Sequence, residues 1–524
     1  MHEQKQMTQR GRDRGRSSNP AGWLLSIDGS ASKTRGLSPA VCLCFLIGLS
    51  ACVATAEDEP RRSEAALAPA QTEAKADVKV SRTAVAINAR FSELQTFFDL
   101  PASFPLADAV ALPSVAAFPG EMSMSDAARL SVTDGMDVRI ASTRVSSETA
   151  AARASALSLG PQISLQGDLS KDLANSETTT GNLSRTGDLT VNLSRPLLNL
   201  PRQKEVERRF NDVANAELDL ENARSLAILA AADAYLSVLQ SQLIITYAEE
   251  YEQRLQALAT IMEQRVTAGG SSGAELERVR GRIQGIRATI SDVRAGLSTS
   301  LSNLVLLTGQ QPRSIRLPLD IRFSIPTTST EAFAVASEQN WEVRTATGAL
   351  RTNELRLREV ELRRRPTMDA TLSQGVGADW TEGKSSSSNT SIGVTMNWTL
   401  YRSGMLSEEL AEAAADIAEA QARRTKALQT LQSNLQRSYV VLGAVAEQLE
   451  AYRQQVESNE AVVLAFTEQI RATNRPVLDV LEAYQTLFQS KIDLTNLLVT
   501  ETQVNLQVLH LLGELSVDQI IRRP

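Results

Sequence analysis

The spacing of apolar residues changes twice within each half of this chain. In about 137–159 and 333–363 apolar residues recur every three to four positions, which predicts a helix at the start of each half. Pro161 and Pro366 close these two helices, because proline disfavours helical geometry in the residue before it. Beyond each proline the spacing shortens to two residues, so we expect strands next.

Strict alternation of apolar and polar residues then marks one strand in each half. Over nine or ten residues it is typical of a transmembrane barrel strand, with its apolar side chains outward. A half-buried antiparallel hairpin of a soluble domain has the same pattern and stays an alternative. We expect exposed loops at 174–184 and 379–389, which are rich in Ser, Thr, Asn and Gly. The alternating apolar residues are Ile163, Leu165, Gly167 and Leu169 in the first half, and Ile392, Val394, Met396, Trp398 and Leu400 in the second.

Each half returns to a helical pattern of unusual length. From about Arg202 to Ala268, and from about Gly404 to Ala472, there is no Pro and almost no Gly, so each helix would extend about 100 Å. Residues that step by three and four along both arms predict antiparallel coiled-coil hairpins. In the first hairpin these are Tyr251, Leu255, Leu258 and Met262, then Leu276, Val279, Ile283, Ile286, Ile290, Val293 and Leu297.

The two halves are copies of one unit, because landmarks recur at a nearly constant offset. We expect an N-terminal extension at 52–130, a first repeat at 131–312 with a β-hairpin at 161–198, and a second repeat at 335–516 with a β-hairpin at 366–401. One chain then has four strands, too few for a closed barrel, so several chains must contribute. The matching pairs are Pro161 with Pro366, Asp137 with Glu342, Tyr235 with Tyr439, Glu275 with Asp479, and Gly309 with Gly513.

Composition narrows the functional classes. The only histidines of the 524 residues are His2 and His510, so no histidine-based triad or metal cluster can form within one chain. Residues 1–51 hold seven of the 54 Lys and Arg and three of the 61 Asp and Glu, so the remainder carries a charge of −11, which argues against nucleic acid as a partner. We expect no catalytic residue, metal or cofactor, and therefore not an enzyme.

The N-terminus has the pattern of an export signal. A long basic stretch precedes the apolar run Ala40–Leu49, which is too short to span a bilayer permanently. Leu49-Ser-Ala-Cys52 resembles the lipobox of bacterial lipoproteins, which implies that 1–51 is removed and that Cys52 is lipidated. An ordinary cleavage site beside a small residue is the alternative. Val53 is not the aspartate of inner-membrane lipoproteins, which favours the outer membrane.

Together, residues 131–516 resemble the TolC-like family of outer-membrane channel proteins. The resemblance rests on the duplication, the strand positions, the helix lengths and the tip sequences. It implies a mainly α fold with a small β part: duplicated long hairpins that form a periplasmic α-barrel, and four strands per chain in a trimeric 12-stranded outer-membrane β-barrel. It also implies a homotrimer in outer-membrane lipid, whose tips meet a periplasmic adaptor protein of an inner-membrane pump.

The first tip follows the family pattern of an arginine, a glycine-containing turn and an acid. These are Arg265, the turn residues Gly269, Gly270 and Ser271, and Glu275. The resemblance implies that Arg265 and the turn contact the adaptor. Any tight helical hairpin also favours Gly and Ser, and an acid in the first turn of a helix complements its dipole.

The second tip implies a periplasmic gate. Arg475 lies four residues before Asp479, and Glu482 follows three further on, so both acids lie on one helix face. In a trimer they would form an acidic constriction, and Arg475 could pair with Glu275 to hold it closed. Arg471 and Asn474 would join the adaptor contact. The alternative is N-terminal charge on a helix that proline starts.

The tip departs from the family at two positions, with Thr473 in place of a glycine and Ile470 in place of a tyrosine. The latch is therefore expected to be built differently.

Without a P-loop or a bundle of transmembrane helices, the chain is predicted to be a passive exit duct for efflux or type I secretion. A lipid-anchored coiled-coil tether of the envelope is the alternative, and strand alternation favours the duct.

Overall fold

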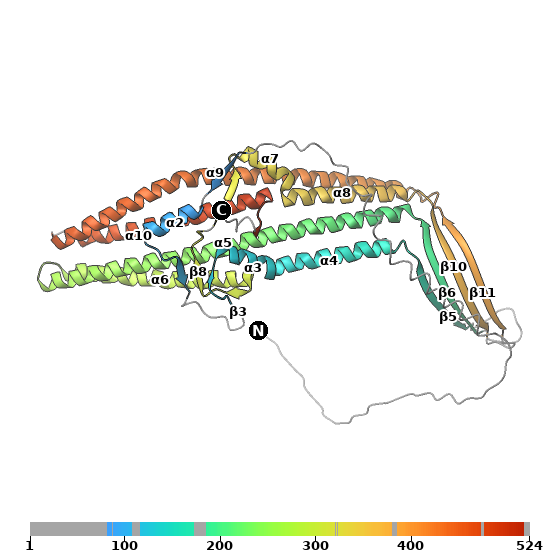
Figure 1. The fold of residues 1–524 in the computed structure, drawn as a ribbon, viewed down its shortest axis with the longest axis horizontal. Coiled ribbons are helices and arrows are strands. Elements are labelled where there is room, and N and C mark those ends of the chain that lie inside the picture. Colours follow the sequence, from blue (N-terminus) through green and yellow to red (C-terminus); the bar gives the residue numbers. More distant parts are fainter. Residues whose placement is uncertain are drawn as a thin grey trace, which may run out of the picture. The chain divides into compact units, whose positions relative to one another are not determined.

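The computed structural model divides the chain into two units, 1–78 and 79–524. It describes residues 81–85, 87–106, 116–171, 185–319, 321, 323–379, 385–472 and 476–517, all in the second unit. The predicted signal and Cys52 lie outside the described residues. Within the second unit, the long helices lead to a sheet at one end and to the tips of two helical hairpins at the other (Figure 1). The fold is mainly helical with few strands, as predicted.

The same elements occur twice, with matching lengths. In both copies the helix before the strands has 22 residues, the long helix after the strands has 68, and the helix that returns from the tip has 36. The first copy contains α4 (Met136–Leu157), β5 (Gln162–Lys171), β6 (Arg185–Leu198), α5 (Leu200–Thr267) and α6 (Gly273–Thr308). The second contains α8 (Trp341–Leu362), β10 (Thr367–Asp379), β11 (Ser385–Asn397), α9 (Met405–Ala472) and α10 (Val477–Leu512).

Each copy also begins with an additional short helix that is capped in the same way. Ser123 accepts from the backbone N–H of Asp126 at the start of α3 (Met124–Asp134), and Thr328 accepts from that of Glu331 at the start of α7 (Ser329–Gln339). The single helix that the sequence predicts at 333–363 is therefore two helices. The break falls at Asn340, whose side chain accepts from the N–H of Val343 and so begins α8.

The helices pack as two hairpins, and α5 of the first copy also contacts α8 and α10 of the second. Helix α5 packs against α6, α4, α8 and α10, whereas α9 packs against α10 and α8. The predicted coiled-coil residues form the core of the first hairpin, with Leu255 and Met262 of α5 and Val279 of α6 fully buried. Glycines with left-handed geometry end both return helices, with φ of +70° at Gly309 and +73° at Gly513.

The four longest strands form one antiparallel sheet in the order β11-β10-β6-β5. Strand β11 begins at Ser385, so part of the loop predicted at 379–389 is strand instead. Trp398 and Leu400, which the alternation placed in that strand, follow its end at Asn397. Both outer strands, β5 and β11, have one edge that pairs with no other described strand.

The described part of the N-terminal extension expected at 52–130 contains helices and short strands that pack against the repeats. Helix α2 (Ile87–Phe97) buries Ile87, Phe91 and Leu94 in the hydrophobic core. The short strands on either side of α2 pair with strands that follow α6. These are β1 (Arg82–Val85) with β9 (Phe323–Pro326), β2 (Ser103–Pro105) and β4 (Glu121–Met122) with β8 (Ser314–Arg316), and β3 (Ala116–Ala117) with β7 (Gln310–Gln311).

Two equivalent tyrosines attach these short strands to the long helices. The Tyr235 hydroxyl of α5 can donate to the carbonyl oxygen of Arg316 or, at 3.1 Å, to that of Met122, and it accepts from the backbone N–H of Arg316 at 3.1 Å. In the second copy the Tyr439 hydroxyl of α9 donates to Pro326 O at 2.7 Å. Burial raises the pKa of both phenols, so each stays protonated and able to donate.

Among the described helices, α5 is long and apolar enough to cross a membrane by length and composition. Its apolar window is 56% buried by the rest of the protein. Because neighbouring helices cover it on several sides, we interpret α5 as a core helix.

Candidate functional site: the two ends of the helical repeats

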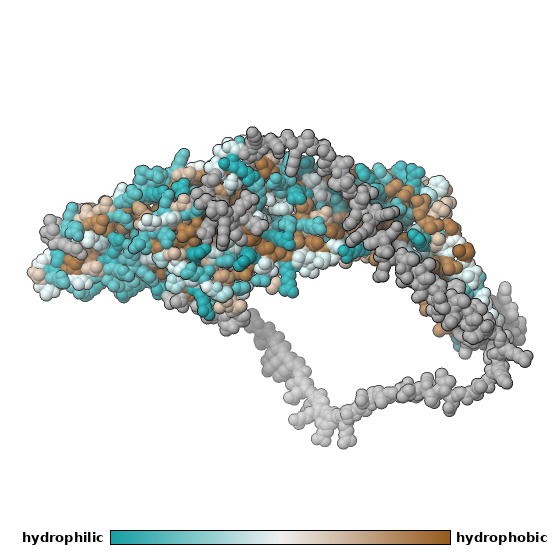
Figure 2. All heavy atoms as spheres, in the orientation of Figure 1, coloured by the Kyte–Doolittle hydropathy of each residue, from teal (hydrophilic) through white to brown (hydrophobic). Residues whose placement is uncertain are grey.

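One face of the sheet is the more apolar one, and one of its rows is apolar on all four strands. In one row Ile163 pairs with Leu193, Leu193 with Leu372, and Leu372 with Ile392. No described element covers the row at its outer strands, since Ile163 is 65% and Ile392 85% exposed. Figure 2 shows apolar surface gathered where the strands meet the helices.

The next row across the same strands is polar throughout. Ser164 pairs with Asn192, Asn192 with Ser373, and Ser373 with Ser391, and the last two hydroxyls lie 2.6 Å apart. Side chains of neighbouring rows point to opposite faces. The sheet therefore separates an apolar face from a polar face, and both faces of β5 are exposed.

At the opposite end, the turn between α5 and α6 has the hydrogen bonds of a Schellman motif. Gly269 has φ of +74°, its N–H donates to Val266 O at 3.0 Å, and the N–H of Gly270 donates to Arg265 O at 2.8 Å. Both glycines are exposed. Left-handed backbone at this position favours a residue without a Cβ, so the glycine signal has a local structural cause.

The charged residues of the first tip are bonded within the protein. Ser271 donates to the Glu275 carboxylate at 2.7 Å, across the start of α6. The Arg265 guanidinium reaches the other hairpin and donates to the carbonyl oxygen of Ile470 in the last turn of α9, at 3.3 Å. Arg265 thus connects the two tips, a role that the sequence did not suggest.

The second tip is described only in part. Asn474 and Arg475 lie outside the described residues, as does the side chain of Arg471, so the predicted Arg475–Glu275 pair stays a prediction. In α10, Asp479 is half-buried and Glu482 exposed, one turn from the helix start. They lie beside a buried stripe of apolar residues, Val477, Val480 and Leu481.

A buried lysine joins the two hairpins and was not identified from the sequence. The Lys491 side chain of α10 is 6% exposed, and its ammonium lies 2.9 Å from Glu250 of α5 and 3.5 Å from Glu460 of α9. It also lies 4.8 Å from the ring centre of Phe98, just after α2. The detectable signal was a lysine in the three-and-four spacing of buried leucines, after Leu487 and before Leu494.

Three carboxylates between these helices have shifted pKa values. Burial alone would raise the pKa of Glu250, but hydrogen bonds and charges from Lys491 and Arg254 outweigh it and hold that pKa below its usual range. Burial raises the pKa of Asp233 in α5 to about 6, partly offset by a hydrogen bond with Gln503. Burial likewise raises the pKa of Glu501, against the lowering effect of Arg90 and Arg453.

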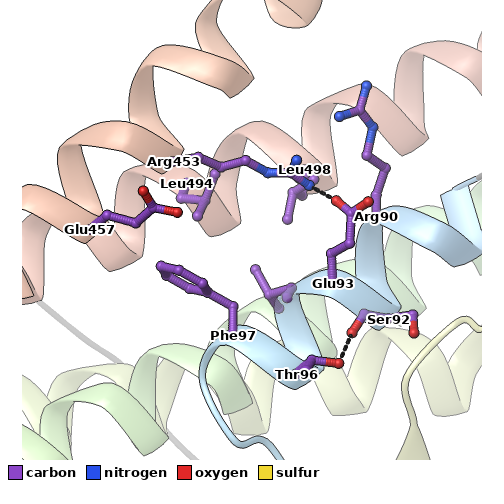
Figure 3. A pocket seen from close by; sticks show the side chains of 10 residues that line it. Arg90, Ser92, Glu93, Thr96, Phe97, Arg453, Glu457, Leu494 and Leu498 are labelled. Atoms are coloured by element: carbon purple, nitrogen blue, oxygen red, sulfur yellow. Dashed lines mark hydrogen bonds and ion pairs between the residues drawn. The ribbon is translucent and has the colours of Figure 1, made fainter.

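A groove of about 640 Å³ lies between α2 and the second hairpin (Figure 3). Glu93 of α2 forms an ion pair with Arg453 of α9 at one side of the groove. The Phe97 ring and the Glu457 carboxylate point into the groove. Leu494 of α10 contributes to its apolar wall. Among the residues that the structure describes, no group of three or more His, Cys, Asp or Glu is arranged to hold a metal ion.

Duplicated long helical hairpins that end in a two-faced antiparallel sheet define the architecture of an outer-membrane channel subunit. The chain belongs to the outer membrane efflux protein family, whose model matches residues 135–310 and 334–514. This confirms the resemblance on which the sequence interpretation rests.

Individual relatives are distant in sequence and close in fold. Over 343 residues the chain is 20% identical to the outer membrane protein TolC of Salmonella enteritidis, covering 63% of this chain and 70% of that protein. The solved CmeC outer membrane channel of Campylobacter jejuni superposes with a TM-score of 0.64 at 15% identity, covering 77% of this chain and 90% of that one. The open-state MtrE channel of Neisseria gonorrhoeae gives 0.65 at 13% identity, with 80% and 97% covered.

Proposed function

We propose that this protein is the outer-membrane exit duct of a tripartite efflux or type I secretion system, assembled as a homotrimer. The observation that carries the proposal is the exposed, two-faced sheet with an open edge on β5 and another on β11. An apolar face of this kind is stable against lipid, and its polar partner face suits a water-filled lumen. Pairing the two edges between neighbouring chains would satisfy the backbone groups that a membrane cannot solvate.

Two neighbouring residues of β11 test the barrel. Val394 is 58% exposed on the apolar face and pairs with Ala370, whereas Thr395 pairs with Asp369 on the polar face. Val394→Arg should impair assembly, because arginine on the lipid face costs about 2–4 kcal/mol near mid-membrane. Thr395→Arg is the matched control and should be tolerated. Trimer yield in mild detergent measures both, and equal yields would overturn the barrel assignment.

A lipid anchor at Cys52 is part of the proposal, and chain length permits it. About 30 residues separate Cys52 from Arg82, enough to span about 100 Å when extended. Strand β1 pairs with β9, which is bonded to Tyr439. Tyr439 lies about 34 residues along α9, or about 50 Å from the strand end. Palmitate labelling tests the anchor, and label that persists in Cys52→Ala would refute it.

At the other end, we propose that Asp479 and Glu482 line the periplasmic constriction. Glu482 is exposed beside a stripe that packs within the hairpin, so it is free to face a symmetry axis. Three copies of two carboxylates would attract cations. Asp479→Asn with Glu482→Gln should lower cation selectivity in planar-bilayer recordings, whereas an unchanged selectivity would make them ordinary helix-start charges.

The tips are proposed to meet the adaptor, with Gly269, Gly270 and Ser271 in the first turn and Arg471 and Asn474 in the second. The exposure of Gly269 and Gly270 in the first turn supports this role. Cross-linking from cysteine at Ser271 to a co-expressed adaptor would test it. The described part of the mature chain holds no native cysteine that would compete.

A further inference from the structure

The corner where α8 meets β10 carries three consecutive arginines, followed by Pro366. Arg363 already forms two ion pairs within the chain, since its guanidinium lies 3.2 Å from the Glu359 carboxylate and 3.1 Å from that of Glu409. Arg364 and Arg365 are exposed, and among the described residues neither guanidinium has a hydrogen bond or an ion pair. Two cations are therefore available at the helix-side edge of the sheet.

An aromatic residue is fixed directly beside these cations. The Trp398 indole N–H donates to the carbonyl oxygen of Arg364 at 3.0 Å, and the residue stays 52% exposed. Trp398 stands at the next alternating position after Val394 and Met396, directly beyond the end of β11 at Asn397. Tyr401 follows and is also exposed.

The first repeat shows that the helix end itself does not need these charges. Its equivalent of Arg363-Arg364-Arg365 is Ser158-Leu159-Gly160, followed by Pro161. The two C-cap residues have nearly the same backbone, with φ and ψ of −66° and −13° at Ser158 and −62° and −13° at Arg363. A helix-dipole role would apply equally to both copies. The first repeat instead brings one arginine to this corner from α5, since Arg202 Nε donates to the Ser158 hydroxyl at 2.6 Å, so the run of three arginines belongs to the second repeat.

We propose that Arg364, Arg365 and Trp398 bind the phosphodiester headgroup of a membrane phospholipid, one site per chain. The inference rests on the proposed membrane barrel. Tryptophan and tyrosine favour the boundary between hydrocarbon and water, and guanidinium groups bind phosphate oxygens in a bidentate way. The site sits at the edge of the apolar face, where acyl chains could lie on the sheet while the phosphate meets the two arginines. The exposed Glu361 on the preceding turn forms no ion pair with either arginine in the described structure.

The test counts lipids bound to the intact purified trimer by native mass spectrometry. The probes are dioleoyl phosphatidylglycerol and dioleoylglycerol, which lacks the phosphate. R364Q/R365Q should weaken phosphatidylglycerol binding about tenfold or more and leave dioleoylglycerol binding unchanged. The matched control is R351Q/R358Q, which removes two exposed arginines from the same helix further from the strands, and it should bind like the wild type.

Three outcomes would overturn the proposal. One is equal phosphatidylglycerol binding by the two double variants. Another is displacement of the lipid by millimolar inorganic phosphate, which would make the corner a free-anion site. The third is loss of trimers in R364Q/R365Q with no change in lipid binding per trimer, which would make it a contact between subunits. Conductance in planar bilayers tests the proposed function separately, because a wild type that conducts without retaining phosphatidylglycerol would refute only the lipid site.

Discussion

The buried Lys491 should be worth more to stability than its charge alone suggests, because it bonds three helices and the segment after α2. Lys491→Met keeps most of the side-chain volume and removes the ammonium group. Glu250 then keeps Arg254 as a partner, whereas Glu460 keeps no other described ion pair. The substitution therefore leaves the Glu460 carboxylate of α9 without its cation, and this carboxylate faces the space where α5, α9 and α10 meet.

The expected loss of stability depends on how exposed the two carboxylate partners of Lys491 are. Removing one member of a fully buried pair costs about 3–5 kcal/mol. The side chains of Glu250 and Glu460 are 38% and 34% exposed, so water can hydrate part of each carboxylate after the substitution. We therefore expect a loss of about 1–3 kcal/mol.

The assay is thermal unfolding of the purified protein in detergent, followed by circular dichroism. Lys204→Met is the matched control, because Lys204 also has an ion pair, with Glu207 one turn away, but its side chain is 33% exposed. The control should lose less than about 0.5 kcal/mol. If the two methionine variants unfold at the same temperature, the ammonium does not hold the hairpins together and the argument fails.

Three further results are expected from the same measurement. Gly269→Ala should destabilise the first tip by about 1–2 kcal/mol because of its positive φ, whereas Gly273→Ala, at the start of α6 with open space around it, should be neutral or stabilising. Tyr235→Phe should cost about 1–2 kcal/mol, and more than Tyr439→Phe, because Tyr235 is fully buried. Since the pKa of Asp233 is raised to about 6, its folded form binds the proton more tightly, so stability should fall as pH rises from about 4 to 6. Asp233→Asn should reduce this slope and leave the part that Glu501 contributes, because burial also raises the pKa of Glu501, and an unchanged slope would contradict the assignment.

Much of the architecture could be predicted because it depends on periodicity and on a few special residues. The expected long helices at about 202–268 and 404–472 correspond to α5 and α9 within two residues at each end. Proline and glycine also mark the boundaries of other elements. Pro161 and Pro366 directly precede β5 and β10, and Gly309 and Gly513 end α6 and α10 with left-handed backbone. Each of these residues restricts the backbone locally, without help from tertiary contacts.

The elements that the sequence did not predict depend on contacts between distant segments. Strands of two to four residues, such as β1 and β4, are too short for a period, and they form because β9 and β8 provide partners more than 190 residues away. Helix α2 buries only one face. The break at Asn340 and the first turns of α3 and α7 did have a signal, because capping residues stand at each start, but a continuous apolar spacing concealed it.

The tip residues show the same limit for function. The pattern of arginine, glycine and acid was visible, but the bonding partners were not. Arg265 donates to Ile470 O in the other hairpin, and Glu275 accepts from Ser271. A motif specifies which residue types meet at a turn, whereas the partner of a long flexible side chain is selected by the packing of whole helices. The predicted gate contacts of Asp479 and Glu482 stay predictions for this reason.

The order of the strands constrains how copies of this chain can assemble. The open edges, β5 and β11, lie at opposite ends of the sheet, so a ring that uses both edges of every chain joins β11 of one chain to β5 of the next. Such head-to-tail contacts close into rings. Two chains would give a barrel of about eight strands. The interior of such a barrel is filled by side chains or holds one small ligand. If the protein is the exit duct that we propose, an open passage needs at least three chains, which agrees with the proposed trimer.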